Sequence, residues 1–170
     1  MKMKKFLTLG LAAIMAVSMV GCVNQHPEEA NGTAASSDDV RIVATSPATA
    51  DICDRLELDL VGVCSSTLST IPERYKDVTQ IGTAMSPDLE ILKSLKPDYV
   101  LSPSSLQSDL QPKYESIGVN SIFLNLKSVE GMYASISDLG QKFDREEQAQ
   151  ALVDEFNAFM EEYKKKNEGK

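Results

Sequence analysis

Val40-Arg41-Ile42-Val43-Ala44-Thr45-Ser46-Pro47 opens the folded part of this 170-residue chain, and this stretch decides the fold. Its first six residues form a short run that is apolar around Arg41 and rich in β-branched side chains, which is typical of a buried strand. Ser46-Pro47 then signals a helix start, because serine caps helices and proline is tolerated in their first turn. Leu60-Val61-Gly62-Val63 is the next apolar run, so residues 40–63 predict a strand, a helix and a second strand.

The same alternation continues along the chain to residue 143. We expect further strands over 99–102 and 119–124, a mostly irregular segment over 65–80, and helices over 87–95, 106–117 and 128–143. Strands that alternate with helices predict an α/β fold in three layers, in which helices cover both faces of a parallel sheet.

The last segment differs from the rest because it is one long helix. Asp144 is expected to cap a helix over 145–166, with apolar residues at helical spacing and lysines in the last turn, where they suit the helix dipole. A single helix that leaves an α/β unit is interpreted as a connector. The chain is therefore divided into an α/β domain of residues 40–143 and a connector helix of residues 144–170. An apolar stripe should stay exposed wherever the domain does not cover this helix, along Leu152, Phe156 and Phe159.

Residues 1–21 have the form of a lipoprotein signal peptide. Three lysines precede an uncharged, mostly apolar region over 6–20, which is short for a bilayer span. Met19-Val20-Gly21-Cys22 resembles a bacterial lipobox, which implies cleavage before Cys22 and lipidation of its thiol. An ordinary cleavage site with a nearby cysteine is the alternative.

Residues 22–39 have the composition of a flexible tether, and His26, the one histidine of the chain, is expected to be solvated there. Cleavage after residue 21 would remove three lysines and no acid, leaving a net charge of about −11. Such an acidic protein is a poor match for nucleic acid.

Two cysteines remain, Cys53 and Cys64, and their spacing matches no zinc pattern. They either form a disulfide, as extracellular cysteines can, or lie in the core as separate thiols. The sequence predicts no enzyme, because residues 40–170 contain no histidine and no glycine-rich phosphate loop. Cys64 is the one candidate nucleophile.

Gly82-Thr83-Ala84-Met85-Ser86-Pro87-Asp88-Leu89-Glu90 sets a methionine just before a helix start. Ser86 is expected to cap this helix, with Pro87, Asp88 and Glu90 in its first turn. A thioether at this place is able to bind iron. The alternative is an apolar residue that packs against the start of the helix.

The order of these motifs resembles the N-terminal lobe of the iron–siderophore and cobalamin class of ABC-transporter substrate-binding proteins. The resemblance is carried by the 40–49 and 60–63 segments, by Pro87-Asp88-Leu89-Glu90 and by Leu95-Lys96-Pro97-Asp98-Tyr99-Val100. Within the class, segments 71–78, 82–88 and 124–133 look most like the haem-receptor lipoproteins of Gram-positive iron uptake.

This resemblance implies two lobes joined by a long helix, with haem in the groove between them and Met85 as an axial ligand of its iron. The haem receptors take the second ligand, a histidine, from a C-terminal lobe that we do not find in this sequence, so a truncated, non-functional fragment is one alternative. A siderophore or corrinoid binder, in which Met85 only packs, is another.

The resemblance also implies partners and a location. Glu90 matches a glutamate that docks on the ABC permease, with a solvated carboxylate as its alternative, and an upstream haem-donor protein is a further expected partner. The protein would be anchored by lipid to the outer face of a Gram-positive cell membrane.

Two loops are expected to complete the haem site, because helix N-termini bind anions and open α/β sheets bind ligands at the carboxyl ends of their strands. These loops hold Ser46, Pro47 and Ala48, and Ser65 and Ser66. Ordinary helix and loop capping is the alternative for their hydroxyl groups, and it is compatible with binding.

Overall fold

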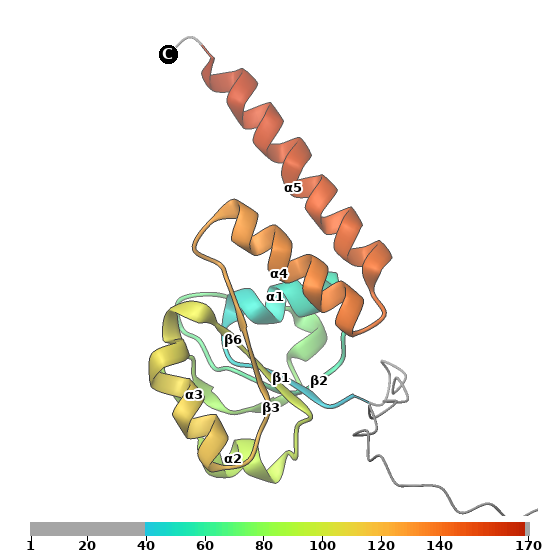
Figure 1. Ribbon diagram of the computed structural model, residues 1–170. Helices are drawn as coiled ribbons and strands as arrows, with labels where there is room; N and C mark the ends of the chain where they lie inside the picture. The colour runs from blue at the N-terminus through green and yellow to red at the C-terminus, as the bar shows by residue number, and fades with distance from the viewer. Residues whose placement is uncertain (1–39, 169–170) are drawn as a thin grey trace, which may run out of the picture. The chain divides into compact units, whose positions relative to one another are not determined.

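The computed structural model describes residues 40–168 (Figure 1). The signal peptide, Cys22 and the tether with His26 lie outside the described residues, so those assignments stay predictions. Among the described residues, no helix has both the length and the apolar character that crossing a bilayer requires.

The centre of the fold is a sheet of five parallel strands in the order β3-β2-β1-β6-β7. These strands are β1 (Ile42–Ala44), β2 (Leu60–Val63), β3 (Thr79–Gln80), β6 (Tyr99–Pro103) and β7 (Ser121–Leu124). The predicted α/β class is confirmed. The short edge strand β3 was not predicted, because its two exposed polar residues give no apolar run and only their pairing with Gly62 and Val63 makes them a strand.

Helices cover both faces of this sheet, as the alternating side chains of β1 require. Ile42 and Ala44 pack into a core with α1 (Pro47–Arg55) and α4 (Val129–Lys142). Val43 points the other way, into a core with α2 (Leu89–Ser94) and α3 (Gln107–Ser116). Figure 1 shows these two helix layers with the sheet between them. Two short 3-10 turns, η1 (Glu73–Tyr75) and η2 (Ser104–Leu106), complete the domain.

The helix after Met85 begins later than the sequence predicts, and Ser86 is not its cap. Ser86–Pro87 forms β5, which pairs antiparallel with β4 (Gly82–Thr83). Asp88 is the cap instead: its carboxylate accepts the amides of Glu90 and Ile91, both at 3.0 Å. The amide of Asp88 donates to the Ile81 carbonyl at 2.7 Å, so the chain closes a hairpin before the helix can start.

The predicted cap of the last helix is also wrong. α5 (Glu146–Asn167) has Arg145 at its N-cap position without a side-chain capping bond. Asp144 instead takes a left-handed conformation with φ 54°, and Arg145 donates its amide to the Gly140 carbonyl at 2.8 Å. Asp144 therefore lies in the turn that ends α4, where an αL residue is common.

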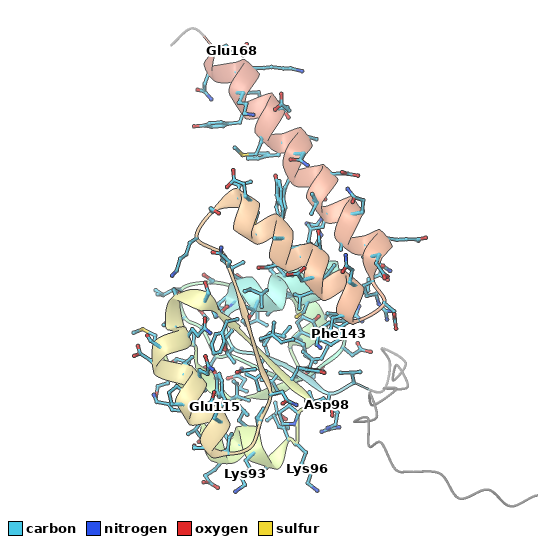
Figure 2. All side chains as sticks on the ribbon, in the orientation of Figure 1. Lys93, Lys96, Asp98, Glu115, Phe143 and Glu168 are labelled. Carbon is cyan, nitrogen blue, oxygen red and sulfur yellow. The ribbon has the colours of Figure 1, made fainter. Side chains whose placement is uncertain are left out.

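The two halves of α5 have different surroundings. Leu152 is buried in the core formed with α4 and α1, and Phe156 stacks on Tyr133 at 6.3 Å between ring centroids. Phe159 and Tyr163 are 63% and 58% exposed. Figure 2 shows the later side chains of α5, up to Glu168, standing clear of the sheet. The exposed apolar stripe thus begins at Phe159, beyond the part of the helix that the domain covers.

Cys53 and Cys64 are separate, buried thiols. Burial raises the pKa of Cys53 to about 12 and that of Cys64 to about 11. Of the two alternatives, the structure shows the one in which the cysteines are separate core thiols. A raised pKa makes the Cys64 thiol a poor nucleophile.

Candidate ligand-binding site

A hollow of about 470 Å³ lies where β1 and β2 end. It is lined by the start of α1, the loop after β2 and the β4–β5 hairpin: Pro47, Ser65, Ser66, Thr67, Leu68, Ser69, Thr83, Ala84 and Met85. Four of the six predicted haem-site residues, Pro47, Ser65, Ser66 and Met85, therefore meet at one surface. This surface is at the carboxyl ends of parallel strands, where open α/β sheets bind their ligands.

Met85 stands at the tip of the hairpin, because Ala84 and Met85 are the two turn residues between β4 and β5. Its side chain is 75% exposed, and Leu68 on the opposite loop is 96% exposed. A single exposed apolar side chain needs no explanation. Two that line the same hollow offer a ready apolar contact to a ligand.

The hairpin that carries Met85 is held by its backbone. Gly82 has φ 90°, and a Cβ at this position would lie 2.9 Å from the Ser86 carbonyl oxygen, so only glycine fits. The Gly82 carbonyl accepts the amide of Ser65 at 2.8 Å, which ties the hairpin to the loop after β2. The two sides of the hollow are therefore fixed to one another.

Two hydroxyl groups of the lining organise its loops. The Ser66 hydroxyl accepts the amides of Leu68 and Ser69 at 3.2 and 3.1 Å. The Thr83 hydroxyl accepts the amide of Ser86 at 3.3 Å. Ser66 thus shapes the loop that presents Leu68, and Thr83 supports the turn that presents Met85.

The other two predicted residues are placed differently. Ser46 is buried and forms a capping box with Thr49, so its hydroxyl serves the start of α1. Ala48 is exposed but does not line the hollow. Pro47 lacks an N–H, and the amides of Thr49 and Ala50 are bound to Ser46 at 3.1 and 2.9 Å. The start of α1 therefore offers an anion fewer amides than a helix N-terminus usually does.

A buried chain of hydroxyl groups, which the sequence did not single out, joins the ends of β1 and β6. The Thr45 and Ser102 hydroxyls are 2.7 Å apart, and Ser102 lies 3.1 Å from the Tyr114 hydroxyl. All three residues are buried, and burial raises the pKa of Tyr114. The sequence signal for this cluster was Thr45, a polar residue directly after the apolar strand β1. The contribution of Tyr114 could not be predicted, because Tyr114 lies on α3, far along the chain.

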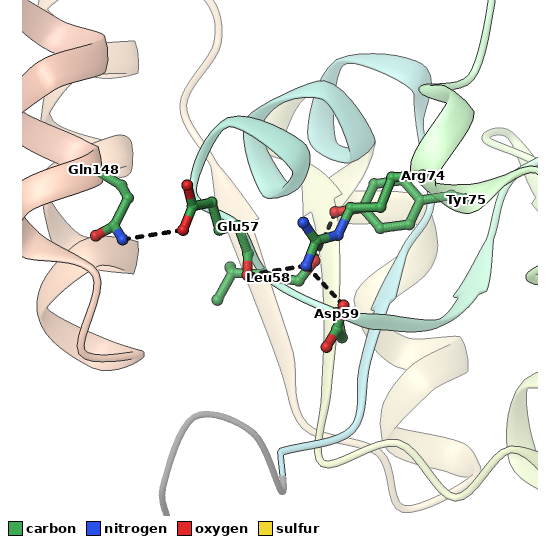
Figure 3. A network of polar contacts seen from close by, with 6 residues as sticks. All are labelled: Glu57, Leu58, Asp59, Arg74, Tyr75 and Gln148. Atoms are coloured by element: carbon green, nitrogen blue, oxygen red, sulfur yellow. Dashed lines mark hydrogen bonds and ion pairs between the residues drawn. The ribbon is translucent and has the colours of Figure 1, made fainter.

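Hydrogen bonds also hold the segment between β2 and β3 at its second end, just before β3 (Figure 3). The Tyr75 hydroxyl donates to the Leu58 carbonyl at 2.6 Å, and Arg74 donates to Asp59 at 2.8 Å and to the Glu57 carbonyl at 3.3 Å. Gln148 of α5 donates to the Glu57 carboxylate at 3.4 Å. The long loop that begins at Ser65 is thus anchored at both ends.

Among the described residues, no charged side chain lines the hollow. Within residues 40–168, no cluster of three or more histidine, cysteine, aspartate or glutamate side chains is arranged to hold a metal ion. Glu90 lies outside the lining, exposed in the first turn of α2.

Comparison with known proteins fits this architecture. The chain is 36% identical over 166 residues to the high-affinity heme uptake system protein IsdE of Staphylococcus aureus, covering 98% of this chain and 54% of that protein. It thus spans about half the length of the curated relatives it matches.

Solved structures give the same picture. An ABC transporter substrate-binding protein from Listeria monocytogenes EGD-e superposes with a TM-score of 0.73 and 40% identity, over 77% of this chain and 50% of that one. Staphylococcus aureus IsdE complexed with heme gives a TM-score of 0.73 and 38% identity, over 78% and 51%. A family model described as periplasmic binding protein matches residues 42–170. The chain therefore belongs to the periplasmic binding protein family.

Proposed function

We propose that this protein binds haem as the cargo of an ABC import system, and that the Met85 thioether binds the haem iron. The observation that carries the proposal is the position of Met85, 75% exposed at the tip of a hairpin that its own backbone contacts hold in place. Support also comes from the relatives, one of which is named for heme uptake and was solved with heme.

The chemistry of the hollow suits a flat, mostly apolar ligand. Leu68, Pro47 and Ala84 supply carbon surface around Met85, and the lining adds only neutral hydroxyl groups. A thioether is a soft, neutral donor that favours iron in a macrocycle and raises its reduction potential. Within residues 40–168, no basic side chain lines the hollow to bind an anionic ferric siderophore.

The proposal is tested by titrating the protein with haemin and following the Soret band. We expect stoichiometric saturation in the wild type and, in Met85→Ala, loss of the thioether spectral signature together with an affinity about tenfold or more lower. Met132→Leu is the control, because this methionine is partly buried against the core and is not among the residues that line the hollow. A Met85→Ala spectrum identical to that of the wild type would contradict the ligand assignment. Tighter binding of a ferric siderophore or cobalamin than of haemin would contradict the choice of cargo.

We also propose that the protein is anchored through Cys22 and that Glu90 docks on the permease. Glu90 is exposed on a helix that follows the Met85 hairpin directly, so a partner that contacts α2 would lie beside the cargo. Glu90→Gln should leave haemin affinity unchanged and reduce haem uptake by cells several-fold. Glu130→Gln is the control because it removes another exposed carboxylate from the first turn of a helix, α4. Equal uptake by these two variants would argue against docking at Glu90.

A further inference from the structure

The sulfur-containing residues of the described chain differ sharply in their access to solvent. Within residues 40–168 they are Cys53, Cys64, Met85, Met132 and Met160. Met85 is 75% exposed, whereas Met132 packs partly buried against the core and Met160 is also partly buried. Both cysteines are buried. An oxidant that approaches the folded domain from solution therefore meets the Met85 thioether first.

The two cysteines are protected by chemistry as well as by burial. The reactive form of a cysteine towards oxidants is the thiolate. Burial raises the pKa of Cys53 to about 12 and that of Cys64 to about 11, so both stay protonated at neutral pH. A thioether has no proton to lose, so its oxidation depends on access alone. A mild oxidant should thus modify Met85 and leave the core thiols intact.

The hairpin can carry this modification without unfolding. Met85 is a turn residue, and the bonds that hold the hairpin do not use its side chain. The Gly82 carbonyl accepts the amide of Ser65 at 2.8 Å, and the Thr83 hydroxyl accepts the amide of Ser86 at 3.3 Å. An oxygen atom added to the exposed sulfur would therefore change the surface of the hollow and not the fold beneath it.

We propose that Met85 is a reversible oxidation site, at which a peroxide converts the thioether to a sulfoxide and so prevents the cargo-free protein from binding haem. The sulfur lone pair attacks one oxygen of hydrogen peroxide, the S–O bond forms as the O–O bond breaks, and the second oxygen leaves as water with both hydrogens. The sulfur loses two electrons and the peroxide gains them.

The product differs from the thioether in the two properties that the site uses. A sulfoxide is polar where the thioether is apolar, and its sulfur is no longer a soft donor for iron. Methionine sulfoxide reductases remove the oxygen again, so the change is reversible. The effect on haem binding rests on the proposed function, whereas the preference for Met85 rests on its exposure.

The test treats the cargo-free protein with hydrogen peroxide, removes the oxidant with catalase and follows oxygen gain by peptide mass spectrometry. We expect Met85 to be oxidised several-fold faster than Met132 and Met160. Haemin titration of the protein oxidised at Met85 should then match that of untreated Met85→Ala, and methionine sulfoxide reductase with a thiol reductant should restore the wild-type titration. Met85→Leu is the control, because peroxide should leave its haemin affinity unchanged.

The outcomes separate this inference from the proposed function. Oxidation of Met85 no faster than that of Met132 and Met160 would overturn the inference. So would a loss of haemin affinity in peroxide-treated Met85→Leu, because the damage would then lie elsewhere. If the oxidised protein bound haemin normally while Met85→Ala did not, the inference would fail and the iron ligand would stand. If Met85→Ala itself bound haemin like the wild type, the proposed ligand would fail as well.

Discussion

Met85 and Cys53 show that the role of a sulfur atom depends on whether its side chain is exposed or buried. Met85 is largely exposed on a hairpin and lines a hollow. Cys53 is fully buried on α1 among apolar side chains, and burial raises its pKa to about 12. The exposed thioether is a candidate ligand, whereas the buried thiol acts as a small core residue.

The buried thiol makes stability depend on alkaline pH. Below its ordinary pKa of 9.0, Cys53 is protonated in both the folded and the unfolded chain, so its contribution is fully present. As pH rises from 9.0 towards about 12, only the unfolded thiol ionises, and the free energy of unfolding falls. The steepest loss is about 1.4 kcal/mol per pH unit for this one thiol.

Urea unfolding at several pH values between 8 and 11 measures this effect. Tyr75 and Tyr114, whose pKa values burial also raises, contribute in the same direction, so the useful quantity is a difference. We expect Cys53→Ala to be less stable than the wild type at pH 8, with the gap narrowing as pH rises. A gap that stayed constant with pH would show that the thiol does not titrate differently in the folded state.

The hairpin is the element on which the site depends most. In Gly82→Ala the new Cβ would meet the Ser86 carbonyl oxygen at 2.9 Å while the backbone keeps a φ of 90°. We expect a loss of about 1–3 kcal/mol in stability, with a displaced Met85 and weaker haemin binding.

Gly118→Ala is the matched control for this change. Gly118 also has a positive φ, of 72°, but a Cβ there would meet nothing within 4 Å. It should show the conformational cost alone, about 1 kcal/mol, with normal haemin affinity. If the two variants weakened haemin binding equally, the close contact at Gly82 would not be what positions Met85.

The elements that the sequence predicted well are those with a strong local signal. The strand at 60–63 has a continuous apolar run and the helix after Ser46 has a capping serine followed by proline, and the structure places both as expected. The strand β3 escaped prediction because only its pairing with the distant β2 defines it, and the β4–β5 hairpin escaped because its two-residue strands are too short to show a side-chain pattern. Asp88 caps α2 in place of Ser86, because Ser86 is part of the β4–β5 hairpin.

The site was predictable in part for the same reason. Pro47, Ser65 and Met85 each follow a recognisable signal, and parallel topology brings the ends of β1 and β2 together. Leu68 and Thr83 carried no signal of their own, because their roles come from loop geometry. Ser46 forms the capping box of α1 instead of lining the hollow. Its position at the end of a strand is compatible with capping and with ligand contact, so the sequence alone could not tell the two roles apart.

At the scale of the whole molecule, the chain combines an acidic composition with an uncharged site. Its formal net charge is −8, yet among the residues that the structure describes no acidic or basic side chain lines the hollow beside Met85. Long-range electrostatics therefore do not favour an anionic cargo, so the proposed binding of haem would depend on short-range contacts with the apolar surface and the Met85 thioether.

The helix α5 provides the sharpest test of how the described domain is held together, because this one helix offers a buried and an exposed apolar residue. Leu152 is 2% exposed beneath α4, whereas Phe159 is 63% exposed two turns further along. Leu152→Ala should lower the free energy of unfolding by about 2–5 kcal/mol, through lost burial and a cavity. Phe159→Ala should change it by less than about 0.5 kcal/mol, since a residue in water loses little packing.

Urea unfolding followed by circular dichroism measures both variants. A loss in Phe159→Ala as large as that in Leu152→Ala would mean that the second half of α5 is covered in solution, and sedimentation of the wild type would then show an assembly larger than one chain.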